Sequence, residues 1–359
     1  MLCIIQNLSA ITNVYRHVLA HTFLPDMSSD KSTLATESTL LGADAPFPFN
    51  DHEMDVILRS SDRTDFYVHT AMLSVASPVF RDLFELAQAR GLRLTSPTSS
   101  SMKRCVEMAE DRHSLDLFLR WCDTRGSIPL EMTIPDIATV IRLADKFQVE
   151  GIASRIAPHL YQFIESEPLS VYAIAACHAS FTHDNATWGN ALARRAAKQL
   201  LMSPMPFQTP NYEFFKTVPA IVMEPLYQYH RACGMSVREN IQKHHISWLS
   251  NRSTWPWLSQ CTCTTQGRIP QVPDWWRAYL IRLCELLENQ PSATTILALN
   301  SDDDLMSVIT HSCHCTLGNG IICSAKALHD AERFHAGLSK YIQEAVDKIV
   351  LDFSKRKMK

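Results

Sequence analysis

The spacing of apolar residues divides the chain into a mixed part and a helical part. Two short β-type runs, 55–59 and 65–69, flank a polar turn at 60–64, which predicts a β-hairpin. A third run at 105–108 predicts another short strand. Farther along, apolar residues recur at helical spacing through most of the chain. The pattern therefore predicts an α+β fold class: a small sheet with flanking helices, followed by an all-α region.

Helix-start signals occur in the first part. Residues 71–76 predict a short helix, and Ser77 followed by Pro78 predicts the capped start of the next one. Thr133 and Asp136 have the spacing of a capping box, ahead of a buried helical stripe. These local signals place helices on both sides of the predicted strand at 105–108.

The second part is predicted to consist of helices alone. Gly234 is expected to end one of them, because glycine readily adopts the left-handed conformation that follows a helix. The apolar periodicity predicts helices over 168–179, 185–202, 214–234, 276–289 and 325–353.

Composition limits the classes of function. The 359 residues are 46% hydrophobic, and 34 basic against 37 acidic residues give a net charge of −3. A chain with so little net charge has no overall basic field, so we expect no nucleic-acid partner.

No apolar run is long enough to cross a membrane. Only 10 residues are glycine, and no phosphate-binding loop occurs. Eleven cysteines without a secreted disulfide pattern favour an intracellular, reduced location in cytoplasm or nucleus.

Both ends of the chain differ from its centre. The stretch before residue 47 is rich in Ser, Thr, Ala and Asp toward its end, so 1–46 is expected to be a disordered leader. Met27 is an alternative start. Residues 356–359 form a short basic tail, which is a solvated helix end or, less readily, a nuclear signal.

Four motifs in order resemble the BTB/POZ domain. They are Asp-Val-Ile-Leu at 55–58, Phe-Tyr-Val-His at 66–69, Leu-Ser-Val-Ala-Ser-Pro-Val-Phe at 73–80 and Ala-Asp-Lys-Phe-Gln-Val at 144–149. The resemblance covers about a third of the chain. The remainder resembles the helical extension of fungal BTB proteins, through the runs at 168–175, 229–233 and 313–315.

The resemblance implies a BTB/POZ domain over 47–165, with a small mixed sheet flanked by helices, and a helical C-terminal domain over 166–355. It also implies a module that forms homodimers and binds other, unidentified proteins without catalysing a reaction. The residues agree with this view, because no catalytic motif such as His-Glu-x-x-His or Gly-x-Ser-x-Gly occurs.

Four residues are candidates for interaction: Asp55, His69, Phe80 and Phe84. In many members of the family, an acidic residue like Asp55 faces a Lys or Arg that follows the His, and the two form a charged groove. Here Thr70 follows His69, so that cationic partner is missing. The alternative, which we favour, is that Asp55 and His69 are buried polar residues whose hydrogen bonds fix the sheet.

Two further functions remain as alternatives. Some BTB proteins recruit a cullin ubiquitin ligase through a hydrophobic-x-Glu motif; Cys105-Val106-Glu107 is near that place but reads better as a strand. The second alternative is a zinc-stabilised or cysteine-dependent function. Two Cys-x-Cys pairs would supply the four ligands of a tetrahedral zinc. The competing interpretation is that these cysteines are ordinary buried thiols. The candidate ligands are Cys261, Cys263, Cys313 and Cys315.

Overall fold

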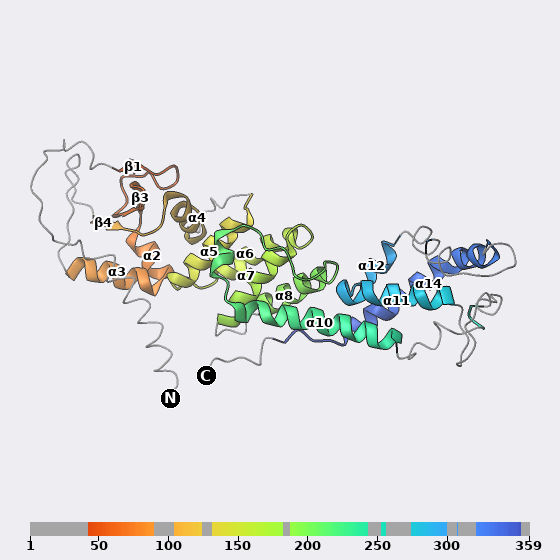
Figure 1. Ribbon diagram of the computed structural model, residues 1–359. Helices are drawn as coiled ribbons and strands as arrows, with labels where there is room; N and C mark the ends of the chain where they lie inside the picture. The colour runs from red at the N-terminus through yellow and green to blue at the C-terminus, as the bar shows by residue number, and fades with distance from the viewer. Residues whose placement is uncertain are drawn as a thin grey trace, which may run out of the picture. The chain divides into compact units, whose positions relative to one another are not determined.

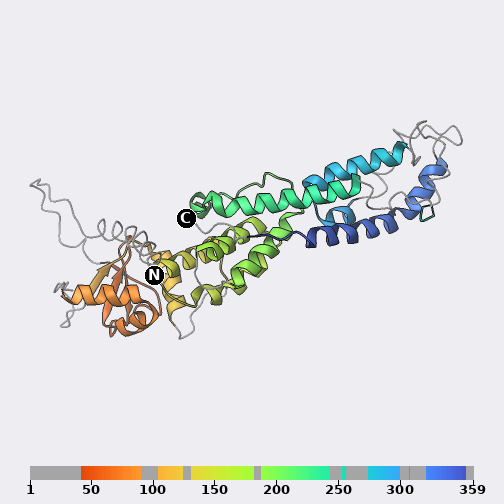
Figure 2. The same ribbon diagram turned by 90° about the horizontal axis from the view of Figure 1, so that it is seen from below.

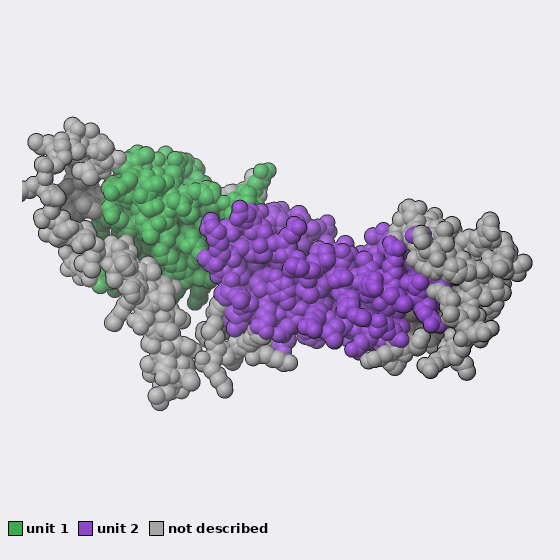
Figure 3. Space-filling view, in the orientation of Figure 1, with its two compact units in different colours: residues 1–153 green, residues 154–359 purple. Residues whose placement is uncertain are grey.

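The computed structural model describes residues 42–89, 104–123, 131–181, 187–242, 253–255, 274–299, 307 and 321–352. Contacts divide the chain into two compact units, residues 1–153 and 154–359, which Figure 3 shows in green and purple. The expected domain boundary at 165 thus lies a few helical turns beyond the division by contacts. Each unit is described by itself below.

The first unit contains a four-stranded mixed sheet in the order β1-β3-β2-β4 (Figure 1). Strands β2 and β3 are antiparallel, with Val56 opposite Val68, which confirms the predicted hairpin. Strands β1 and β4 flank this pair and run parallel to their neighbours, and β4 confirms the strand predicted near 105. The strands are β1 (Ala43–Asp44), β2 (Val56–Arg59), β3 (Thr64–Val68) and β4 (Arg104–Glu107).

Strand β1 corrects the expected extent of the leader. The amides of Ala43 and Ala45 donate to the carbonyls of Arg63 and Asp65, at 3.0 and 2.9 Å. The expectation of disorder is therefore wrong for residues 42–46, because β3 satisfies their backbone groups. A two-residue strand has no periodicity of its own, and its partner lies about twenty positions away, so composition alone did not indicate it. The rest of the leader lies outside the described residues.

Helices surround the sheet in the first unit, and their starts match the sequence signals. Thr133 and Asp136 form the predicted capping box. The Ser77 hydroxyl accepts from the amide of Phe80 at 3.1 Å and so caps the helix that begins at Pro78. The helices are α2 (Thr70–Ala76), α3 (Pro78–Ala89), α4 (Arg112–Cys122) and α5 (Ile134–Lys146).

The second unit is built from helices in its described part, as predicted. Helix α7 is buried on nearly all sides, and its Tyr172 hydroxyl donates to the carbonyl of Val222 in α10 at 3.0 Å. Figure 2 shows α10 running alongside α11. The elements are α6 (Ile152–Leu160), the 3₁₀ turn η2 (Tyr161–Phe163), α7 (Pro168–Phe181), α8 (Thr187–Leu200), α9 (Glu213–Thr217), α10 (Ala220–Gln242), α11 (Asp274–Asn289), α12 (Ala293–Leu297) and α14 (Ile321–Asp347). In the described part of the chain, no helix is both long and apolar enough to cross a membrane.

Gly234 does not end a helix, contrary to the prediction. The expected helix over 214–234 is two helices, α9 and α10, because Pro219 holds the preceding Val218 in an extended conformation. Helix α10 continues through Gly234, which is buried against α11. A Cβ atom at this position would lie 2.4 Å from the carbonyl oxygen of Glu288. The glycine is therefore needed for the close approach of two helices.

We predict that Gly234→Ala destabilises the second unit. The clash with the α11 backbone lowers the free energy of unfolding by up to ~3 kcal/mol. The better helix propensity of alanine raises it by about 1 kcal/mol. The free energy of unfolding should fall by about 2 kcal/mol in urea denaturation. Tryptophan fluorescence is a suitable probe, because Trp275 and Trp276 are buried on α11. Met235→Ala, at the neighbouring exposed position, is the control. A Gly234→Ala protein as stable as wild type would show that the close approach is not required.

Candidate interaction surface

Two of the candidate residues meet at one end of the β2–β3 hairpin. Asp55 directly precedes β2, and His69 directly follows β3. Because the strands are antiparallel and Val56 lies opposite Val68, these flanking residues come together. The Nδ1 atom of His69 lies 3.7 Å from Oδ1 of Asp55.

Asp55 caps the start of α2, although it is distant from that helix in sequence. Its Oδ1 accepts from the backbone amide of Thr70 at 2.8 Å, and its Oδ2 accepts from the Thr70 hydroxyl. His69 occupies the N-cap position but makes no side-chain capping bond. Partial burial by itself raises the pKa of the Asp55 carboxyl, but the hydrogen bonds from Thr70 outweigh this effect, and the net pKa lies below its ordinary value. The strand thus supplies the cap that the helix lacks.

The favoured view of Asp55 and His69 as buried residues is wrong. Their side chains are 55% and 52% exposed. They flank the strands instead of lying within them, so they project beyond the buried positions Val56 and Val68. Asp55 does make hydrogen bonds, as that view expected. Thr70, which stands where many family members carry a cation, is itself the partner of the carboxylate.

Phe80 and Phe84 lie inside the domain and cannot contact a partner in this conformation. Both rings are buried, and Phe80 stacks on Phe147 with 4.6 Å between ring centroids. Phe118 packs on the same Phe147 ring at 5.3 Å. The stack joins α3, α4 and the end of α5. These phenylalanines therefore hold the helices together, and their assignment as interaction residues is corrected.

Val75 has the most exposed of the large apolar side chains described in the first unit, ahead of Phe47 and Leu86. It is 90% exposed, on a helix whose Leu73 is fully buried. Ala71 is also exposed and lies one turn before Val75, with half-buried Ser74 beside it. We call Ala71, Ser74 and Val75 the outer face of α2. Sequence reasoning missed this face, although residues two apart in a helix, such as 73 and 75, point in nearly opposite directions.

Strand β4 contains the triplet considered as a cullin motif. Cys105, Val106 and Glu107 are paired with β2, so the strand interpretation is confirmed. The Glu107 carboxylate lies 3.5 Å from the guanidinium of Arg63. In this structure the triplet is an edge of the sheet and not part of a loop.

The four candidate zinc ligands, Cys261, Cys263, Cys313 and Cys315, lie outside the described residues. Among the residues that are described, no three His, Cys, Asp or Glu side chains converge as a metal site. Zinc binding by the four cysteines stays a prediction, which elemental analysis of the purified protein would test.

Comparison with known families agrees with the fold of the first unit and extends into the start of the second. The BTB/POZ domain model matches residues 48–164, which include β2, β3, β4 and α2 through α6. This part of the chain is a BTB/POZ domain. Such domains are generally non-catalytic modules for protein–protein interaction, so the expected fold and class of function are confirmed at that level. A comparison with curated proteins gives no match. The likeness of the helical region to a fungal extension stays a prediction.

We predict that Asp55→Ala frays α2 of the BTB/POZ domain. Loss of an N-cap acceptor costs about 1 kcal/mol. Amides in α2 should exchange with solvent deuterium several times faster, measured by mass spectrometry on peptides covering 69–77. The carboxylate has a lowered folded-state pKa, so its contribution is present above the unfolded pKa and is lost as pH falls below about 4. The difference from wild type should shrink in that range.

Two variants make this test specific. Asp55→Asn keeps one acceptor oxygen and should have an intermediate effect. Glu53→Ala removes a neighbouring exposed carboxylate and should leave exchange in α2 unchanged. Equal protection of α2 in wild type and Asp55→Ala would contradict the capping role.

Proposed function

We propose that the protein is a non-enzymatic adaptor whose BTB/POZ domain forms a homodimer through the outer face of α2. The observation that supports this most directly is the 90% exposure of Val75 on an ordered helix. Burying a valine side chain contributes about 1.5–2 kcal/mol. In a two-fold symmetric dimer each contact occurs twice, so one such residue on each protomer has a doubled effect.

The Asp55 cap favours the same proposal. A helix that is already ordered loses less conformational entropy when a partner binds to it. Asp55 and Thr70 fix the first turn of α2, one turn before Val75. The outer face of α2 is therefore preorganised for binding.

An intracellular location is part of the proposal. The five cysteines whose side chains are described form no disulfide, and three of them, Cys122, Cys233 and Cys284, are buried. Burial is the largest influence on the thiol of Cys284 and raises its pKa to about 11, which keeps it protonated and unreactive. Thiols of this kind suit the reduced interior of a cell.

We predict that Val75→Glu separates the dimer. The wild-type chain should have twice its mass of 40.6 kDa in light scattering at micromolar concentration. Removing two valine side chains from the interface, about 3 kcal/mol, should raise the dimer dissociation constant about 100-fold. Ile281→Glu, an exposed apolar residue of the second unit, is the matched control and should stay dimeric. A monomeric wild type, or a dimer that Val75→Glu leaves intact, would reject the proposal.

A further inference from the structure

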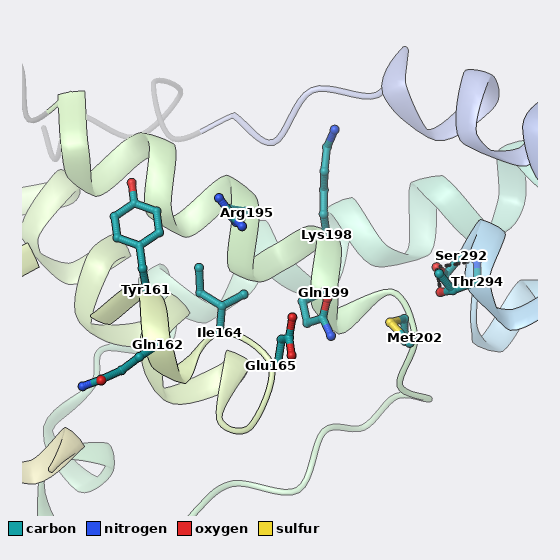
Figure 4. A pocket seen from close by; sticks show the side chains of 10 residues that line it. All are labelled: Tyr161, Gln162, Ile164, Glu165, Arg195, Lys198, Gln199, Met202, Ser292 and Thr294. Carbon is teal, nitrogen blue, oxygen red and sulfur yellow. Dashed lines mark hydrogen bonds between the residues drawn. The ribbon is translucent and has the colours of Figure 1, made fainter. Parts of the chain in front are cut away.

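A pocket of about 490 Å³ lies in the second unit (Figure 4). Its walls come from η2 and the residues after it, from the C-terminal half of α8, and from the start of α12. Pockets that bind small ligands or short peptide segments have about this size. No sequence pattern indicated it, because residues that line it, such as Tyr161 and Thr294, are more than 100 positions apart in the chain.

Arg195 is the residue that gives the pocket its chemistry. Its guanidinium lies 5.6 Å from the centroid of the Tyr161 ring, and Figure 4 shows the two side chains next to each other. No carboxylate of the described residues lies within ion-pair distance of it. Lys198, one turn later on α8, is instead engaged with Asp347 at 2.7 Å. Arg195 is therefore held against an aromatic ring with its hydrogen-bond donors available.

The other walls offer weaker polar groups and a small apolar surface. Gln162 and Gln199 contribute side-chain amides, which can pair with the backbone of an extended peptide. Met202 is exposed at the rim and can cover an aliphatic side chain. Glu165 adds one carboxylate, which likewise has no ion-pair partner among the described residues.

We propose that this pocket binds an acidic segment of a partner protein, with a carboxylate side chain on Arg195. A planar guanidinium matches a carboxylate through two parallel hydrogen bonds. The nearby Glu165 disfavours a doubly charged phosphate more than a singly charged carboxylate. The amides and Met202 suit the peptide on either side of the acid. The site lies outside the BTB/POZ domain match except for Tyr161, Gln162 and Ile164 at its end, and it goes beyond the proposed dimer.

The test uses the full chain labelled at its methionine methyl groups. The Met202 resonance is identified by its loss in Met202→Leu. The probe is an N-acetylated, C-amidated pentapeptide, Ala-Ala-Asp-Leu-Ala, compared with its Asn counterpart. The Asp peptide should shift the Met202 resonance with a dissociation constant of about 1 mM or below. The Asn peptide should bind about tenfold more weakly or not at all, because it lacks the charge.

Two arginine variants decide whether the pocket is responsible. Arg195→Gln should weaken binding of the Asp peptide about tenfold or more. Arg194→Gln changes the adjacent exposed arginine, which does not line the pocket, and should bind like wild type. An equal loss in both variants would overturn the proposal, since it would indicate a general charge effect.

Three other outcomes would also overturn it. They are equal binding of the Asp and Asn peptides, no shift with either peptide, and a shift produced by inorganic phosphate or single-stranded DNA but not by peptide. Light scattering on the same samples reports the dimer separately. A monomeric chain that binds the peptide, or a dimeric chain that does not, distinguishes failure of the proposed function from failure of this site.

Discussion

The pairing of β2 with β3 is the constraint on which the BTB/POZ surface depends. Its register, with Val56 opposite Val68, places Asp55 beside His69 and Thr70. The Asp55 carboxylate can then accept the hydrogen bonds that the start of α2 would otherwise leave to water. With its first turn held in this way, α2 has a fixed orientation, in which Leu73 is buried and Val75 is exposed. A shift of one residue in the strand pairing would move every side chain of the shifted strand to the opposite face.

Local signals predicted the parts of the fold that local interactions determine. The Ser77 cap and the Thr133–Asp136 capping box each involve residues three positions apart, and the hairpin strands are joined by a short turn, so the sequence pattern was sufficient. Strand β1 and Gly234 were misjudged for the opposite reason. The partner of β1 is a distant strand, and the glycine is required by a helix more than 50 residues away. A glycine in a helical pattern is equally compatible with a helix end and with a close packing contact.

The sequence motifs identified the candidate residues but did not show which of their side chains are exposed and which are buried. The motif resemblance located Asp55, His69, Phe80 and Phe84, and three-dimensional packing then separated them into exposed and buried pairs. Helical periodicity could have indicated that Leu73 and Val75 face opposite ways, had it been applied to so short a helix. No comparable signal existed for the pocket, because Tyr161, Arg195 and Thr294 come from three separate elements.

The two proposed contact regions rely on different interactions, and this has a physical consequence. Val75 gains free energy by leaving water, a driving force that moderate salt changes little. Arg195 is charged and exposed, so its attraction for a carboxylate is screened over about 8 Å at physiological ionic strength. Raising the salt concentration should therefore weaken peptide binding while leaving self-association nearly unchanged. If both proposals hold, a partner bound through the pocket exchanges with solution while the proposed dimer stays intact.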